Sequence, residues 1–133
     1  MGRTVWFLTG NKGKLREATH HLQPIGYDVK QLIVPERTII EPQAENLTDV
    51  AMSKIEQAIP FMEHPEDLLL VEDAGLFVDA LDGFPGVYAA YALDTIGCQG
   101  MLRLLTHLGS EDPVQSASLR RASFEAVAVM WVN

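Results

Sequence analysis

The sequence has a single cysteine and no long apolar run. Cys98 alone cannot form an intramolecular disulfide, which fits a reducing cytoplasm, and with no Cys or His near it in sequence it is expected to be a small buried residue. No stretch reaches the roughly eighteen apolar residues of a transmembrane helix. The short apolar stretch near the N-terminus has no signal-peptide cleavage pattern. We therefore expect a cytoplasmic protein without a membrane span.

Basic residues are also few, since 10 Lys and Arg stand against 18 Asp and Glu, for a net charge of −8. A nucleic-acid backbone repels such a chain, which excludes extended duplex binding. A small polyanion can still bind where local lysines and a divalent cation offset the repulsion. With 47% hydrophobic and 21% charged residues, no repeat and no linker, the 133 residues predict one folded domain over 1–133.

Hydrophobic periodicity and turn residues predict strands alternating with helices. Residues 36–45 contain Pro42 and predict a loop or an edge strand, and the polar stretch ending at Ser118 predicts a loop. The alternation predicts an α/β fold, a mixed twisted sheet flanked by three helices. The expected strands are 4–8, 29–34, 68–72, 76–81 and 122–132, and the expected helices are 12–22, 47–59 and about 96–108.

One apolar run, Leu68 to Val71, stops abruptly at the adjacent carboxylates Glu72 and Asp73. Four consecutive apolar residues are typical of a strand buried on both faces. Open α/β sheets bind ligands at the carboxyl ends of such strands. Asp and Gly are also common turn residues, so a capped strand followed by a turn explains this stretch equally well when it is taken alone.

A second polar stretch, residues 9–14, lies between a predicted strand and a predicted helix and reads Thr-Gly-Asn-Lys-Gly-Lys. Backbone amides at a helix N-terminus attract anions, and the side chains of Thr9, Asn11 and Lys14 add donors for a phosphate chain. The stretch is not a Walker A loop, because Leu8 stands where that motif has its first glycine. The alternative is a strand–helix turn with solvated lysines.

A third feature is a set of separated carboxylates, Glu41, Glu72 and Asp73. Mg²⁺ prefers oxygen ligands and takes one or two carboxylates together with substrate phosphates. Adjacent strand residues face opposite ways, so we expect Glu72 and Asp73 to share a site only where the strand ends. A carboxylate beside the metal can serve as a ligand or as a base toward water.

Together these stretches resemble the inosine triphosphate pyrophosphatase, or Ham1-like, family, particularly its archaeal-type members. Residues 9–14 match its Ser/Thr-x-Asn-x-x-Lys phosphate motif, and residues 72–76 with 83–88 match its second signature in the Glu-Asp form. Residues 41–47 look like the segment that bears a metal-binding glutamate. The resemblance covers nearly the whole chain in order.

The resemblance implies Mg²⁺-dependent hydrolysis of ITP, dITP or XTP to the monophosphate and pyrophosphate, by a homodimer. It further implies roles for individual residues, carried over by matching position. Thr9, Gly10, Asn11 and Lys14 would bind the triphosphate, and Lys54 would match a phosphate-contacting lysine. Glu41, Glu72 and Asp73 would bind the metal, and Asp73 is the expected catalytic residue, as ligand or base.

The chain also departs from the family. Family members continue into a Gly-Phe-Gly-Tyr-Asp-Pro motif and a late Ser-His-Arg motif that form the base pocket, and these 133 residues contain neither. We therefore expect a C-terminally shortened fold with altered or reduced base selectivity. The alternative is a non-catalytic nucleotide-binding or assembly module. The apolar strand 122–132 has an uncovered edge, which predicts pairing with another copy of the chain.

Overall fold

The computed structural model describes residues 2–133. Its contacts divide the chain into two compact units. The first unit comprises the residues up to Ala44, Thr48–Asp73 and Val127–Asn133, and the second comprises Glu45–Leu47 and Ala74–Ala126. The single domain expected over residues 1–133 stays a prediction.

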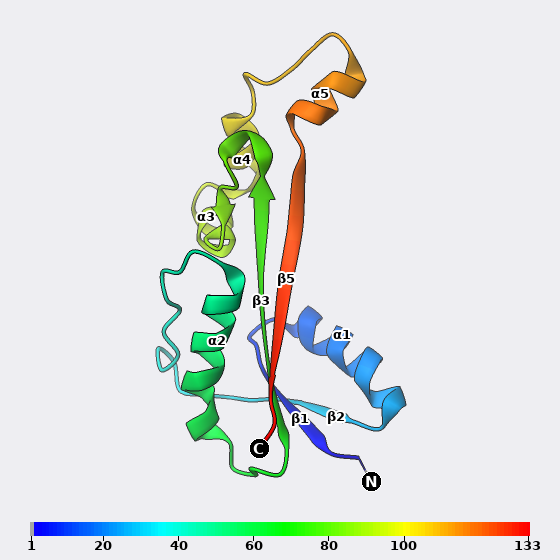
Figure 1. Ribbon diagram of the computed structural model, residues 1–133, viewed down its shortest axis with the longest axis vertical. Helices are drawn as coiled ribbons and strands as arrows, with labels where there is room; N and C mark the ends of the chain where they lie inside the picture. The colour runs from blue at the N-terminus through cyan, green and yellow to red at the C-terminus, as the bar shows by residue number, and fades with distance from the viewer. Residues whose placement is uncertain (1) are drawn as a thin grey trace. The chain divides into compact units, whose positions relative to one another are not determined.

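Strands and helices alternate in the first half of the chain, and a group of helices follows before the last strand (Figure 1). In order, the elements are β1 (Thr4–Leu8), α1 (Lys12–Leu22), η1 (Gln23–Ile25), β2 (Asp28–Gln31), α2 (Leu47–Ala58), η2 (Ile59–Phe61), β3 (Leu68–Val78), η3 (Asp79–Leu81), β4 (Pro85–Gly86), α3 (Ala89–Thr95), α4 (Gly97–Leu104), α5 (Pro113–Leu119) and β5 (Ala122–Trp131), where η marks a 3-10 turn.

The strands form one five-stranded sheet in the order β2-β1-β3-β4, and β5 pairs with β3. β1 runs parallel to both β2 and β3, whereas β3 and β4 are antiparallel. Within the first unit, α1 and α2 lie on opposite sides of these strands (Figure 1). The predicted α/β class, with a mixed sheet and flanking helices, is confirmed.

The core of the first unit forms because side chains on a strand alternate between the two faces of the sheet. Leu69 and Val71 of β3 pack with Ala51 and Ile55 of α2, and all four are at most 3% exposed. Leu68, on the other face of β3, is also buried. The first half of β3 is therefore covered on both sides, as its continuous apolar sequence predicts.

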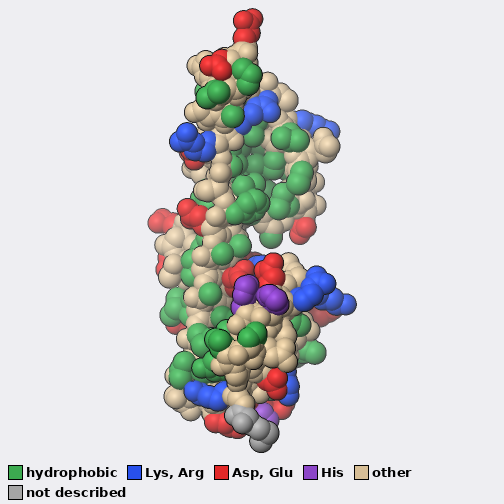
Figure 2. Space-filling model, turned by 90° about the vertical axis from the view of Figure 1, so that its right-hand side faces the viewer, with side chains coloured by type: hydrophobic (Ala, Val, Ile, Leu, Met, Phe, Trp, Pro, Cys, Tyr) green, Lys and Arg blue, Asp and Glu red, His purple; other side chains and the backbone are tan. Residues whose placement is uncertain are grey.

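The second unit has a smaller core, in which Val78, Ala92, Met101 and Leu105 pack together. Glycine at position 75 allows β3 and β4 to approach closely, because a Cβ there would lie 2.5 Å from the carbonyl oxygen of Gly86. Over the second unit, hydrophobic side chains also gather at the surface (Figure 2).

The structure corrects several predicted strands. β3 does not end at Glu72 but continues to Val78, so the separate strand expected over 76–81 is its second half. β2 ends at Gln31, three residues before the predicted end at Val34. Residues 36–45, predicted to be a loop or an edge strand, form a loop. A run of β-favouring residues cannot reveal where hydrogen-bonded partners stop, because that depends on the neighbouring strand.

The helix predictions were right in the first unit and incomplete in the second. Residues 2–133 form five α-helices rather than three. The stretch expected to be a loop up to Ser118 contains α5, and the helix expected over about 96–108 is α4, preceded by the unpredicted α3. Cys98, expected to be buried, is exposed on α4. None of the helices in residues 2–133 has the length and apolar character that crossing a membrane requires.

Candidate active site

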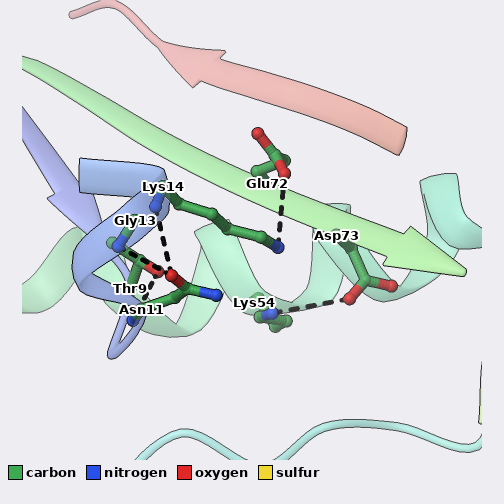
Figure 3. Close-up of polar contacts among 7 residues, drawn as sticks. All are labelled: Thr9, Asn11, Gly13, Lys14, Lys54, Glu72 and Asp73. Carbon is green, nitrogen blue, oxygen red and sulfur yellow. Dashed lines mark hydrogen bonds and ion pairs between the residues drawn. The ribbon is translucent and has the colours of Figure 1, made fainter. Parts of the chain in front are cut away.

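The loop from Thr9 to Lys14 leaves β1 and opens α1, with Asn11 as the N-cap. The Asn11 Oδ1 atom accepts hydrogen bonds from the N–H groups of Gly13 (2.9 Å) and Lys14 (3.1 Å), and the Asn11 N–H donates to Thr9 Oγ1 at 3.1 Å (Figure 3). Such capping fixes the loop where the chain enters the helix. Asn11 and Thr9 therefore shape the loop through their own hydrogen bonds.

Two further residues hold this loop in place. The Gln31 Nε2 atom, at the end of β2, donates to the carbonyl oxygen of Thr9 at 2.7 Å. At position 13, a Cβ would lie 3.1 Å from Asn11 Oδ1, a tight contact, so glycine there leaves room for the cap. Neither residue belongs to the predicted site. The signal that could have found Gln31 is a polar residue inside an apolar predicted strand.

Glu72 lies beside this loop. Leu8 pairs with Val71, so the chain leaving β1 runs past Glu72 on β3. The Lys14 Nζ atom reaches one Glu72 oxygen at 3.2 Å, and both side chains are about 30% exposed (29% and 30%). Because the pair is partly solvated, it contributes little to stability, and Lys14 remains accessible to an anionic ligand.

Asp73 is the buried carboxylate of the site. It is 7% exposed and follows Leu69 and Val71 on the face of β3 that packs against α2. Lys54, on α2, lies 3.7 Å from Asp73 Oδ1 (Figure 3). A buried charge is costly unless a partner compensates it, so the sequence supplies a lysine one helix away.

Glu72 and Asp73 therefore point to opposite faces of β3, each toward a different lysine. We expected the two carboxylates to share a site where the strand ends. That expectation is wrong, because β3 continues for five residues beyond Asp73. The strand that ends here is β1. The chain passes from β1 through α1 to β2, and from β2 through α2 to β3 on the other side of β1, so the carboxyl end of β1 lies at a topological switch point.

Glu41 and Gly10 are both exposed. Glu41 lies in the segment that leads to α2, and Gly10 lies in the loop before α1. Within residues 2–133, no group of three or more His, Cys, Asp and Glu side chains is arranged to hold a metal ion. The site thus consists of a capped helix N-terminus and two carboxylate–lysine pairs. Such an arrangement suits an anion that carries its own metal-binding oxygens, as a phosphate chain does.

Family membership follows from this fold and site taken with the sequence comparison. The fold is that of an α/β protein with a capped strand–helix turn after β1 and two carboxylates on the adjacent strand β3. The profile of the Ham1 family matches residues 5–133, so the chain is a member of the Ham1 family.

The relatives agree in sequence and in structure. A dITP/XTP pyrophosphatase from Thermococcus kodakarensis is 39% identical over 125 residues, covering 94% of this chain and 60% of the relative. One from Pyrococcus horikoshii is 33% identical over 129 residues, covering 97% and 61%. The structure of a HAM1 protein from Coxiella burnetii superimposes with a TM-score of 0.75 at 23% identity, covering 98% and 64%. The chain spans about 60% of the length of these curated relatives.

Proposed function

We propose that this chain is a nucleoside triphosphate pyrophosphatase that hydrolyses the deaminated purine nucleotides dITP, ITP and XTP to the monophosphate and pyrophosphate. The observation that carries the proposal is the Lys14–Glu72 pair beside the Asn11-capped start of α1. It combines a cation, a helix N-terminus and a carboxylate at a switch point. The names of the relatives supply the substrate class.

In this proposal the triphosphate lies along residues 9–14. Lys14 exchanges its Glu72 partner for a phosphate oxygen, and the amide nitrogen of Asn11 and the hydroxyl of Thr9 add donors. Gly10 is exposed beside them, and no atom lies within 4 Å of a Cβ built there, so its backbone is open to a ligand. Lys54 is the second cation, and its pairing with Asp73 keeps it oriented before the substrate arrives.

The carboxylates fit Mg²⁺ in the manner in which that ion usually binds nucleotides. One or two carboxylates suffice when the substrate supplies phosphate oxygens, so a cluster of three is not required. Glu72, next to the loop of residues 9–14, would hold the ion, with Glu41 as a further carboxylate from the exposed segment, whereas Asp73 lies on the opposite face of β3 beside Lys54. When bound, Mg²⁺ neutralises charge that develops on the phosphates.

Asp73 is the proposed catalytic residue. Hydrolysis joins the oxygen of water to phosphorus at the α–β phosphoanhydride, breaks the bridging P–O bond and releases pyrophosphate. A buried carboxylate that faces a lysine is suited to orient that water and to accept its proton. The Lys54–Asp73 pair holds the carboxylate in position in the meantime.

Residues 2–133 also leave one edge of β5 open. β5 pairs with β3, and no strand in that part of the chain pairs with its other edge, while Phe124, Met130 and Val132 are 77%, 43% and 58% exposed. An open apolar edge favours association, so we propose a homodimer formed through this strand, in the cytoplasm. A monodisperse monomer at high protein concentration by light scattering would refute the dimer.

The function is tested by pyrophosphate release from ITP, XTP, GTP and ATP with Mg²⁺. We expect turnover of ITP and XTP, the deaminated purine nucleotides, to exceed turnover of GTP and ATP. Tight nucleotide binding without turnover of any of the four would favour a non-catalytic binding or assembly module instead.

A further inference from the structure

The segment that precedes α2 is held by side-chain hydrogen bonds that no sequence motif predicts. Between β2 and α2, the chain passes through a turn closed by the Thr38 N–H and the Pro35 carbonyl oxygen at 3.2 Å, and then reaches Ile40 and Glu41. Figure 1 shows this segment running beside α2. Ile39 packs against the core, but Ile40 is 70% exposed, so burial does not hold Ile40 where it lies.

The side chain of Gln57 holds Ile40 at both of its backbone polar atoms. The Ile40 N–H donates to Gln57 Oε1 at 2.7 Å, and Gln57 Nε2 donates to the Ile40 carbonyl oxygen at 2.7 Å. Gln57 Nε2 also donates to Ser53 Oγ at 3.1 Å, one helical turn earlier. The two bonds to Ile40 fix the orientation of the amide, because the reversed amide would place an oxygen against the carbonyl of Ile40.

Two fixed atoms on Ile40 determine the position of the next residue. Because the peptide bond is planar, holding the carbonyl oxygen of Ile40 also fixes the plane that contains the nitrogen and the Cα of Glu41. On the other side, Pro42 restricts the backbone of Glu41 to extended conformations. The main chain of Glu41 is thus constrained from both directions, while its side chain stays exposed.

We propose that Gln57 is a positioning residue that presents Glu41 to the metal–phosphate complex by holding Ile40. The inference rests on the proposed function for the role of Glu41 and goes beyond it by assigning the residue that sets the backbone of Glu41. An exposed, flexible carboxylate loses part of its binding free energy because its loop must become ordered when the ligand binds. A loop that is already ordered loses less.

The first test concerns the hydrogen bonds alone. Gln57→Met keeps the length and helix propensity of the side chain and removes both bonds to Ile40. We expect amide hydrogen exchange at Ile40 to become about tenfold faster, while exchange in α2 is unchanged. Glu56→Ala, an exposed neighbour on α2, is the control and should leave Ile40 as in the wild type. Unchanged exchange at Ile40 in Gln57→Met would overturn the proposal.

The second test asks whether Gln57 acts through Glu41. Mg²⁺ affinity is measured by calorimetry with the α,β-methylene analogue of dITP, in which the bond to be cleaved is replaced. We expect Gln57→Met to weaken Mg²⁺ binding about three- to tenfold. Gln57→Glu, which keeps the acceptor but loses the donor, should weaken it too. In a Glu41→Gln background, Gln57→Met should have no further effect.

The second test distinguishes a failure of the positioning role of Gln57 from a failure of the metal role of Glu41. If Gln57→Met weakens Mg²⁺ binding equally with and without Glu41, Gln57 does not act through Glu41 and the proposal fails. If Glu41→Gln itself leaves Mg²⁺ binding unchanged, the metal role of Glu41 in the proposed function fails, and the positioning role of Gln57 fails with it. Hydrogen exchange at Ile40 shows separately whether Gln57 makes its hydrogen bonds to Ile40.

Discussion

The two units of the chain differ in what their residues do. All of the predicted site residues lie in the first unit, where core residues of β1 and β3 are fully buried: Val5, Leu69 and Val71 are 0% exposed. In the second unit, Tyr91 and Leu102 are 72% and 53% exposed, and no predicted site residue occurs. The proposed chemistry therefore lies in the unit that has the larger buried core, while the described residues of the second unit expose more large apolar side chains.

The largest expected effect is the loss of stability when a core leucine of either unit is replaced by alanine. Leu69→Ala in the first unit should lower the free energy of unfolding by about 3–4 kcal/mol, because a fully buried leucine leaves a cavity that its neighbours cannot fill. Leu105→Ala, at a site 7% exposed in the second unit, should cost about 2–3 kcal/mol. Urea denaturation of both variants measures this. Equal losses would mean that the two cores are packed equally well.

The next effect in size concerns Lys14, the charge proposed to contact the phosphates. Lys14→Met removes the cation next to Glu72 and should reduce kcat/KM for ITP about 100-fold, because a positioned charge stabilises the phosphates in the transition state. Arg103→Met, an exposed basic residue of α4, is the matched control in the second unit. If Arg103→Met lowered kcat/KM as much as Lys14→Met, the assignment of the proposed site to the first unit would be wrong.

A smaller difference in stability is expected between the N-caps of α1 and α5, one from each unit. Asn11 accepts hydrogen bonds from two amides at the start of α1, whereas Asp112 accepts one, from Val114, at the start of α5. Asn11→Ala should therefore destabilise the protein by about 1–2 kcal/mol and Asp112→Ala by about 0.5–1 kcal/mol. Thermal unfolding measured by circular dichroism tests the order. If Asp112→Ala were the more destabilising substitution, the cap of α1 would contribute less to stability than its two hydrogen bonds indicate.

The smallest effect is expected at Cys98. Because this thiol is exposed on α4, Cys98→Ser should change the free energy of unfolding by less than about 0.5 kcal/mol. A reagent that reacts with accessible thiols should modify Cys98 in the folded protein. If the thiol reacts only after unfolding, Cys98 is buried, as first expected from the sequence.

The same contrast explains how far the sequence predicts the structure. In the first unit, strand 4–8 and helix 12–22 were predicted at their observed bounds, because long periodic patterns between clear turn residues leave little ambiguity. In the second unit, α3 and α5 are only seven residues each and too short to show a period. The continuation of β3 depends on pairing with β4 and β5, which a local pattern does not encode.

The sequence predicted which elements lie side by side but not the geometry between them, and the roles of the site residues stay predictions. The motifs at 9–14 and 72–73 identified the elements that meet, because parallel strands bring their loops to one edge. The separation of Glu72 and Asp73 onto opposite faces, each with its own lysine, depends on β3 continuing past them. The supporting amides of Gln31 and Gln57 act on backbone atoms, so no motif marks them.

The central claim is that the chemistry depends on the buried carboxylate of Asp73, and pyrophosphate release from ITP tests it most directly. Asp73→Asn should lower kcat by a factor on the order of 100 or more, as loss of a proton acceptor does. Asp79→Asn, an exposed position in the second unit, should match the wild type. Turnover by Asp73→Asn at the wild-type rate would contradict the account.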